Sequence, residues 1–442
     1  MNNIQITPLN NWIYAKTGTQ DADSLREYQL SKLRDTVCYV KDKSRFYGRR
    51  LANIVPGKID DISDISYIPF TTQDMLAGDP LGFVCVPAGD VGRIVTMATS
   101  GTAGTVKRIF YTREDQELSV DFFHHGMTSI VSKDDRVLIF LPGEADGSVG
   151  NLLKRGLDRF GCAGIVYGPI HDYKDAYHAL VQSGATCAVG LPAQLAAIAC
   201  LGEKIRLKSV LLCSDYVSEA VAHMLEDMWQ CDVFRHYGMT ETGLGGGVDC
   251  QAHEGYHIRE ADMLFEIIDP YSGSPIRDGG QGEIVFTTLT RMGMPLIRYR
   301  TGDISSLITK QCRCGSAIRR LSRIYGRVDD IVTIDGGYKI SMPILDEILF
   351  GVQGVAGFTA GIRNGPERAV LEITAYAPCG GKVLKKAEER LLEDTRLSEP
   401  VSREYLSLVF RSGGDEVLTY GNKKRKIVDK RTENRGRLGG TE

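Results

Sequence analysis

Short apolar runs alternate with stretches of helical pattern between Ile94 and Val233, and no other feature restricts the fold as strongly. A chain that runs from strand to helix to strand returns to its sheet through a crossover, which makes the neighbouring strands parallel. The alternation therefore predicts a parallel sheet covered by helices. The predicted strands are Arg136–Leu141, Gly164–Tyr167, Thr186–Val189 and Ser209–Leu212, and the predicted helices are Asp172–Ser183 and Ser218–Trp229, with Ser218 as N-cap.

The flanking segments have different patterns. Residues 1–90 are typical of short helices joined by loops, whereas Ala261–Thr288 consists of extended segments separated by Gly, Pro and Asp turns, which predict a small antiparallel unit. After a turn-rich stretch at Gly326–Asp330, the remaining chain mixes strands with a charged helix. These last predicted elements are strands Gly357–Ile362 and Ala369–Tyr376 and helix Gly381–Asp394.

We therefore predict an α/β protein of two domains. Residues 1–328 form the larger domain, with parallel sheets covered by helices and the small antiparallel unit, and residues 329–442 form a smaller α+β domain. The last residues, RTENRGRLGGTE, have nothing apolar to pack and are expected to fray.

Composition excludes several classes of protein. Of 442 residues, 43% are hydrophobic and 25% are charged, which is typical of soluble globular proteins and excludes disordered and collagen-like chains. The net charge of −3 gives no basic field for nucleic acid or an anionic membrane, and we find neither a spanning segment nor a signal peptide. Eleven scattered cysteines favour reduced thiols. We expect a cytoplasmic protein that binds neither nucleic acid nor membrane.

The sharpest local motif is TSGTAGTVK at residues 99–107, directly after the strand-like run IVTMA. Backbone N–H groups of a glycine-rich loop can cradle phosphate oxygens, and hydroxyl groups and a lysine add directed contacts. The spacing is not that of a Walker loop. An ordinary polar turn has a similar composition, so the motif alone leaves both interpretations open.

Three further segments favour the nucleotide interpretation. HYGMTE at residues 236–241 offers an aromatic face, a hydroxyl group and a carboxylate. RYRTGD at residues 298–303 places an acid in a tight turn among cations, and GRVDD at residues 326–330 pairs a guanidinium group with acids. Each segment alone fits a capped turn or a surface ion pair. Their occurrence together and in this order indicates a common site.

With these motifs, the chain resembles adenylate-forming enzymes of the acyl-CoA synthetase superfamily, in the phenylacetate–CoA ligase-like branch. The resemblance extends from Ser44 to Arg431 and includes SRFYGRRLANI, YTREDQE, GEIVFTTLT and PLIRYRTGDI. Such enzymes join a carboxylate to the α-phosphate of ATP, release pyrophosphate and pass the acyl group to a thiol. The resemblance implies ATP, Mg²⁺ and coenzyme A as cofactors, a small carboxylic acid as substrate, and a mobile C-terminal domain.

The resemblance also implies a role for each motif residue. The residues implied to hold the β- and γ-phosphates are Thr99, Ser100, Gly101, Thr102, Gly104 and Lys107. Those implied to surround the adenosine are Asp215, Tyr237, Gly238, Asp303 and Arg327, of which Asp215 is a loose match. Thr240 would bond the α-phosphate, Glu241 would ligate Mg²⁺, and Asp329 would be the hinge of the C-terminal domain.

Relatives in this family carry a catalytic lysine near the C-terminus. In GNKKRKIVDKR at residues 421–431, counting back from Asp429 and Arg431 assigns this role to Lys423, with Lys424 in reserve and Asn422 where glycine is usual. Without the upstream motifs, a solvated basic run would be the simpler interpretation.

Cysteine and histidine spacing suggests a structural zinc site. Cys250 and His257 are followed by the pair Cys312 and Cys314, and some relatives have a similar arrangement. Thiolate and imidazole ligands in a set of four are the usual structural Zn²⁺ site. Free thiols with a surface histidine are the alternative.

Two departures from the family leave the substrates open. LPGEADGS at residues 141–148 replaces a Gly- and aromatic-rich stretch, so the acid is uncertain; Phe122, Phe123 and Tyr167 either line an aryl pocket or belong to the core. The loop at Gly336–Ile340 is one residue longer than in relatives, which leaves a carrier protein, an amine or a cofactor as alternatives to coenzyme A. A nucleotide-binding protein without catalysis and a zinc-linked scaffold are further alternatives, and a homodimer is one candidate assembly.

Overall fold

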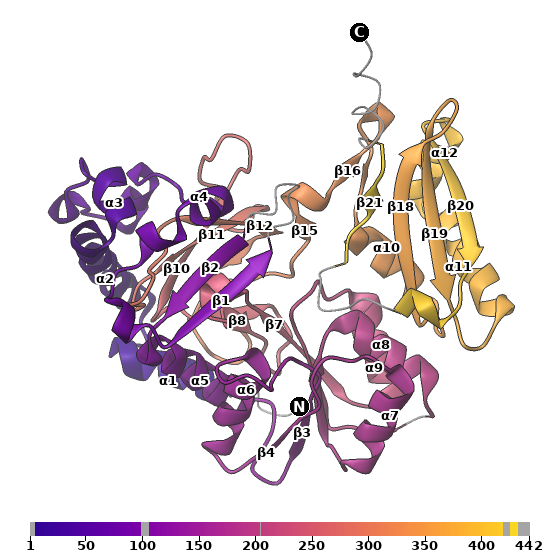
Figure 1. The fold of residues 1–442 in the computed structure, drawn as a ribbon, viewed down its shortest axis with the longest axis horizontal. Coiled ribbons are helices and arrows are strands. Elements are labelled where there is room, and N and C mark those ends of the chain that lie inside the picture. The colour runs from indigo at the N-terminus through magenta and orange to yellow at the C-terminus, as the bar shows by residue number, and fades with distance from the viewer. Residues whose placement is uncertain (1–4, 99–105, 204, 419–424, 432–442) are drawn as a thin grey trace. The chain divides into compact units, whose positions relative to one another are not determined.

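The computed structural model describes residues 5–98, 106–203, 205–418 and 425–431 (Figure 1). The chain divides into two compact units, each assembled from separate segments. The first unit comprises Met1–Asp135, Pro142–Gly164 and Phe234–Ile324, and the second comprises Arg136–Leu141, Ile165–Val233 and Tyr325–Glu442. Among the described residues, no helix is both long enough and apolar enough to cross a bilayer.

Helices dominate the N-terminal part of the first unit, as predicted. Thr7 caps the first helix by accepting a hydrogen bond from the backbone N–H of Asn10, and Gly18 ends this helix in the left-handed conformation. The helices of the unit are α1 Pro8–Thr17, α2 Ala22–Lys43, α3 Arg45–Arg50, α4 Gln73–Gly78, α5 Arg113–Met127 and α6 Val149–Asp158.

The segment predicted to be antiparallel forms part of a sheet in the first unit. Strands β10 and β11 pair antiparallel, with Phe265 opposite Phe286, and β11 pairs antiparallel with β12. Apolar residues of this sheet pack against the helix α2 in one core. The strands that lie wholly or mainly in the unit are β1 Arg93–Ala98, β2 Val106–Tyr111, β7 Asp232–Tyr237, β8 Gly247–Val248, β9 Tyr256–Ile258, β10 Met263–Ile268, β11 Gly282–Thr288, β12 Tyr299–Ser305, β13 Leu307–Ile308 and β14 Arg320–Leu321.

One expectation about strand pairing is wrong. The predicted parallel alternation began at Ile94, yet β1 and β2 pair antiparallel in a two-stranded sheet of their own, with Ile94 opposite Phe110. The connection between Ala98 and Val106 consists of residues 99–105, whereas a parallel return needs a connection of a dozen or more residues. The parallel alternation begins instead at Arg136.

The parallel sheet itself lies in the second unit, where the prediction is confirmed. Strand β5 pairs parallel with both β3 and β6, and Ser218 caps α9 by accepting from the backbone N–H of Val221. The elements of this part are β3 Arg136–Ile139, β4 Ala163–Val166, α7 Tyr173–Gln182, β5 Cys187–Gly190, α8 Pro192–Leu201, β6 Ser209–Leu212 and α9 Glu219–Trp229 (Figure 1).

The C-terminal segment adds an α+β layer to the second unit, as expected. Its sheet has the order β20-β19-β18-β21, in which β18 and β19 are antiparallel. The elements are β15 Gly326–Arg327, β16 Val332–Thr333, β17 Lys339–Ile340, α10 Met342–Leu349, β18 Gly357–Asn364, β19 Ala369–Tyr376, α11 Gly381–Glu393, α12 Thr395–Ser402, β20 Leu406–Ser412 and β21 Val428–Asp429.

The core of the second unit joins both of its parts. Leu212 and Leu225, from the parallel α/β part, belong to the same buried cluster as Leu345 and Phe358 from the C-terminal segment. The α/β fold class with parallel and antiparallel sheets is therefore confirmed, while the predicted domain boundary at residues 328 and 329 stays a prediction.

Candidate functional site

Two residues from distant motifs form a buried ion pair in the first unit. Lys107 lies on β2, whose alternating burial turns this side chain inward, and Glu241 lies in the short 3₁₀ turn Thr240–Thr242 that follows β7. The Lys107 ammonium group bonds to Oε1 of Glu241, and the two residues are 7% and 2% exposed. Burying either charge alone would be costly, so each charge stabilises the other.

Neighbouring residues hold this carboxylate and its turn. The Tyr299 hydroxyl donates to Oε1 of Glu241 at 2.9 Å, and Nη1 of Arg291 donates to the Glu241 carbonyl oxygen at 2.6 Å. The Tyr111 hydroxyl donates to the carbonyl oxygen of Thr240. Sequence reasoning missed these supporting roles, although Tyr111 opens the YTREDQE segment and Tyr299 lies inside RYRTGD.

A second pair joins two residues implied to contact the nucleoside. The Tyr237 hydroxyl donates to Oδ2 of Asp303 at 3.1 Å, and both residues are buried. At Gly238, which follows Tyr237, a Cβ atom would lie 2.6 Å from the carbonyl oxygen of Leu244. Because contacts that short do not occur, the chain needs glycine to leave β7 at this point.

The remaining candidates for the nucleotide site belong to the second unit or fall outside the described residues. In the second unit, Asp215 accepts from the N–H of Tyr216 at 2.9 Å, Arg327 Nε is 3.7 Å from Asp330 Oδ2, and Asp329 is exposed. The candidates outside the described residues are Thr99, Ser100, Gly101, Thr102, Gly104, Lys423 and the reserve Lys424.

The aromatic candidates for an acid pocket are found in well-packed surroundings. Phe122 and Phe123 are 1% and 7% exposed and contact the ring of His236, with centroid distances of 5.8 and 6.2 Å. Burial lowers the pKa of His236 to about 4, so this imidazole is neutral at pH 7. Tyr167 belongs to the second unit, where its hydroxyl donates to Asp175.

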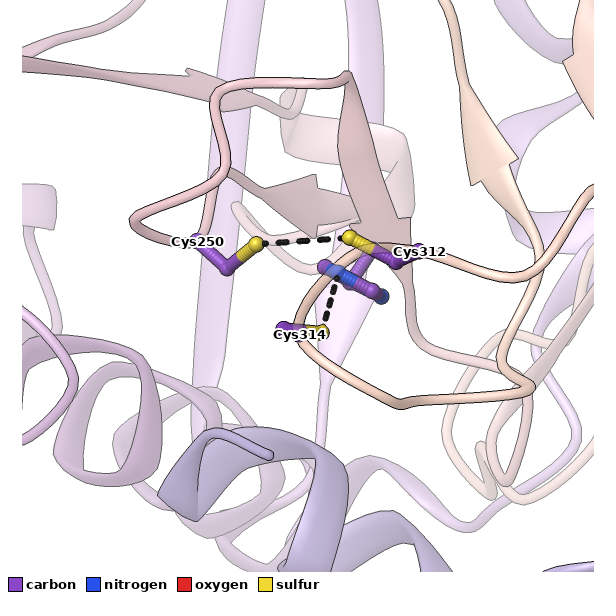
Figure 2. A group of neighbouring side chains, drawn as sticks. Cys250, Cys312 and Cys314 are labelled. Atoms are coloured by element: carbon purple, nitrogen blue, oxygen red, sulfur yellow. Dashed lines mark hydrogen bonds between the residues drawn. The ribbon is translucent and has the colours of Figure 1, made fainter. Parts of the chain in front are cut away.

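The four residues of the suspected zinc site come together in the first unit. Cys250, His257, Cys312 and Cys314 are all buried, and their ligand atoms lie within 4.8 Å of one another (Figure 2). Cys250 Sγ is 3.7 Å from Cys312 Sγ, and Cys314 Sγ is 3.5 Å from Nε2 of His257. Bond lengths of about 2.3 Å to sulfur and 2.0–2.1 Å to nitrogen in a tetrahedron require separations of about 3.8 and 3.5 Å. These two separations, and a donor set of three thiols and one imidazole, fit a structural Zn²⁺ site.

A buried amide lies on the other side of the histidine. Asn10 on α1 is fully buried, and its Nδ2 is 3.5 Å from Nδ1 of His257. Its Oδ1 has no hydrogen-bond partner in the described part of the chain. A histidine bound to metal through Nε2 carries its proton on Nδ1, which then needs an acceptor. Turning the Asn10 amide by half a revolution would supply that acceptor.

Comparison with known proteins gives matches over most of the chain. Residues 92–292 match the model of the AMP-binding enzyme family. The chain is 28% identical to a phenylacetate–coenzyme A ligase of Thermus thermophilus, covering 72% of this chain and 74% of the relative. It is 27% identical to the phenylacetate–coenzyme A ligase of Escherichia coli, covering 75% of this chain and 77% of the relative.

A solved structure has the same fold. The crystal structure of 2-hydroxyisobutyryl-CoA ligase, in the postadenylation state with R3-HIB-AMP, superposes with a TM-score of 0.79 and 18% identity, covering 95% of this chain and 92% of that chain. At that identity the likeness supports the fold alone. Residues 92–292 therefore match the AMP-binding enzyme family, and the curated relatives support a likeness to its phenylacetate–CoA ligase-like branch.

Proposed function

We propose that this protein is an AMP-forming carboxylate–CoA ligase. It activates a small carboxylic acid with ATP to an acyl-adenylate and transfers the acyl group to coenzyme A. The observation that carries the proposal is the buried pair of Lys107 and Glu241, which joins the end of the TSGTAGTVK motif to the end of the HYGMTE motif. The names of the phenylacetate–coenzyme A ligase relatives support the acid and the acceptor.

The pair is suited to exchange its partners when ATP binds. A phosphate oxygen that takes the Lys107 ammonium group leaves the Glu241 carboxylate without its cation, and a divalent cation restores the balance of charge. Lys107 and Tyr299 each bond to Oε1 of this carboxylate, so Tyr299 can keep the side chain oriented during the exchange. Bound Mg²⁺ would neutralise phosphate charge at this carboxylate.

Further residues would complete the nucleotide site. Asp303, held by Tyr237, is proposed to accept bonds from the ribose hydroxyl groups, and Thr240 to bond the α-phosphate. Lys423 would stabilise the charge that develops on phosphorus, because fixed charges near the reacting atoms lower the barrier most. The phosphate contacts of the TSGTAGTVK motif, the contacts of Asp215 and Arg327, and the hinge role of Asp329 are proposed on the family resemblance.

Formation of the thioester tests this function. We expect AMP and an acyl-CoA of matching mass only when ATP, Mg²⁺, coenzyme A and one acid from a panel of aryl and aliphatic acids are all present. AMP release that does not depend on coenzyme A would contradict the proposed acceptor. ATP binding without AMP release on any acid would contradict the enzyme assignment. A cytoplasmic location and a homodimer stay predictions from the sequence.

The proposal includes a structural zinc ion at Cys250, His257, Cys312 and Cys314. The separations between these ligand atoms support it, and Asn10 would orient His257. Metal analysis should find one zinc ion per chain, lost when Cys312 and Cys314 are both replaced by serine. Cys38 and Cys379 are two exposed cysteines outside this cluster, and replacing both by serine gives the matched control. Purified protein without metal would contradict this site.

A further inference from the structure

The turn between β6 and α9 holds an unusual backbone conformation. Ser214 has a φ angle of 69°, in the left-handed region that favours glycine. Such conformations cost free energy in residues with a side chain and persist only where their surroundings enforce them. The next residue is Asp215, the proposed adenine contact. The geometry of this turn therefore bears directly on nucleotide binding.

A carboxylate from the C-terminal segment braces the turn. Glu347 on α10 accepts from the Tyr216 hydroxyl at 2.9 Å, and from the backbone N–H groups of Glu219 and Ala220 at 3.0 and 3.1 Å. The last two groups open α9, where a negative charge is favoured by the helix dipole. One side chain thus bonds to the turn and to the helix that follows it.

The brace lies among other charges. Asp346, beside Glu347, is buried and pairs with Arg425 at 2.6 Å. Asp215 and Glu347 both act on Asp346 by charge repulsion, and Arg396 is within electrostatic reach of Glu347. The hydrogen bonds from Tyr216 and α9 therefore hold Glu347 close to Asp346, whose charge repels it.

We propose that Glu347 is a positioning residue for the nucleotide: by bonding Tyr216 and the first turn of α9, it keeps the Ser214–Tyr216 turn in the conformation that presents Asp215 to the adenine. This inference rests on the proposed function, because it requires that the protein bind ATP. It goes beyond that function by making α10 a determinant of ATP affinity. Glu347 itself touches no reacting atom.

Direct ATP binding and amide exchange test the proposal together. Glu347→Gln keeps the size of the side chain but removes its charge, and Tyr216→Phe removes only the hydroxyl group. We expect Glu347→Gln to weaken ATP binding by about five-fold or more, in the range of a typical coupling between sites. KM for ATP should rise with little change in kcat. The amides of residues 219 and 220 should exchange faster with solvent.

Glu388→Gln is the matched control, because Glu388 is an exposed acid on α11 in the same unit. It should leave ATP affinity unchanged. Tyr216→Phe should weaken ATP binding less than Glu347→Gln while leaving the amides of α9 protected. Faster amide exchange in Glu347→Gln with ATP affinity within two-fold of the wild type would overturn the positioning role. Wild-type protein that fails to bind ATP would instead overturn the proposed function on which the role depends.

Discussion

Lys107 and Glu241 show how much a single pair of residues can reveal about this site. The sequence predicted both as ATP-site residues, one from a phosphate-binding motif and one from a motif far along the chain. It could not predict that they bond to each other, because the contact depends on how β2 and the turn after β7 pack. Nor could it predict that Arg291 donates to the Glu241 carbonyl oxygen, because Arg291 lies in none of the recognised motifs.

This pair gives a prediction about stability. Lys107→Met or Glu241→Gln leaves an unpaired group in a buried site, and losing one partner of a buried pair costs about 3–5 kcal/mol. The double variant removes both charges, so it should recover much of that loss. The free energy of unfolding in urea of the four proteins, combined as a double-mutant cycle, gives the coupling. Losses that simply add in the double variant would show that the two side chains do not interact.

His236 gives a prediction about pH. Burial lowers its pKa in the folded protein to about 4, from 6.5. Between these values the unfolded chain binds a proton that the folded chain does not, so stability falls as the pH falls from 6.5 towards 4. From the pKa difference, the loss between pH 7 and pH 5 is about 2 kcal/mol for this residue.

His236→Phe removes the titrating group and keeps an aromatic ring. The free energy of unfolding of this variant should fall by about 2 kcal/mol less than that of the wild type between pH 7 and pH 5. Urea unfolding at the two pH values measures both. An identical pH dependence in wild type and variant would mean that folding does not lower the pKa of His236.

At the scale of elements, the strands and helices with strong patterns were predictable and the pairing of β1 with β2 was not. The strands and helices between Arg136 and Trp229 have apolar runs and caps that act locally, so the sequence alone predicts them. The antiparallel pairing of β1 and β2 depends on the short connection between Ala98 and Val106. Apolar periodicity indicates strands but not the direction in which they pair. The metal centre was also not predictable from local pattern alone, because the spacing of its cysteines and histidine along the chain left free thiols as an alternative.

The metal centre yields a prediction that separates a positioning role from simple packing. If Asn10 accepts a hydrogen bond from zinc-bound His257, Asn10→Leu should weaken zinc binding by about 10- to 100-fold, as is typical for such outer partners. Asn11→Leu, the same substitution at an exposed neighbour on α1, is the control. Competition with a chromophoric chelator measures the affinity.

Stability measured with and without zinc provides the second test of Asn10. Replacing a residue that only packs should lower the free energy of unfolding equally in the metal-loaded and metal-free proteins. Replacing a residue that orients His257 should reduce mainly the extra stability that zinc provides. Equal losses in both forms would rule out the orienting role.

At the scale of the whole molecule, the sequence and the structure divide the chain in different ways. The motifs predicted a boundary at residues 328 and 329, whereas the second compact unit includes residues 165–233 together with the C-terminal segment. The hinge of a mobile domain cannot be located from apolar pattern. In this unit, residues 165–233 and the C-terminal segment contribute side chains to the same core. The hydrogen bonds from the first residues of α9 to Glu347 also join these two parts.

The proposed role of Lys423 belongs to this scale, since Lys423 and its reserve Lys424 are remote in sequence from the other candidates. Lys423→Ala should lower the rate of adenylation by at least about 100-fold while leaving ATP affinity within a few-fold of the wild type, because the positive charge acts on the transition state. Lys424→Ala, the neighbouring lysine, is the control and should keep most of the activity. If Lys424→Ala is the inactive variant, the catalytic role belongs to Lys424.

The most direct test of the central claim is exchange of labelled pyrophosphate into ATP, measured with Mg²⁺ and a panel of carboxylic acids. The account predicts exchange that depends on one acid or one class of acid, is independent of coenzyme A, and is lost in Glu241→Gln and Lys423→Ala. Exchange of this kind requires that the acyl-adenylate forms and reverts on the enzyme. ATP binding with no exchange on any acid of a broad panel would contradict the claim that this protein activates carboxylates.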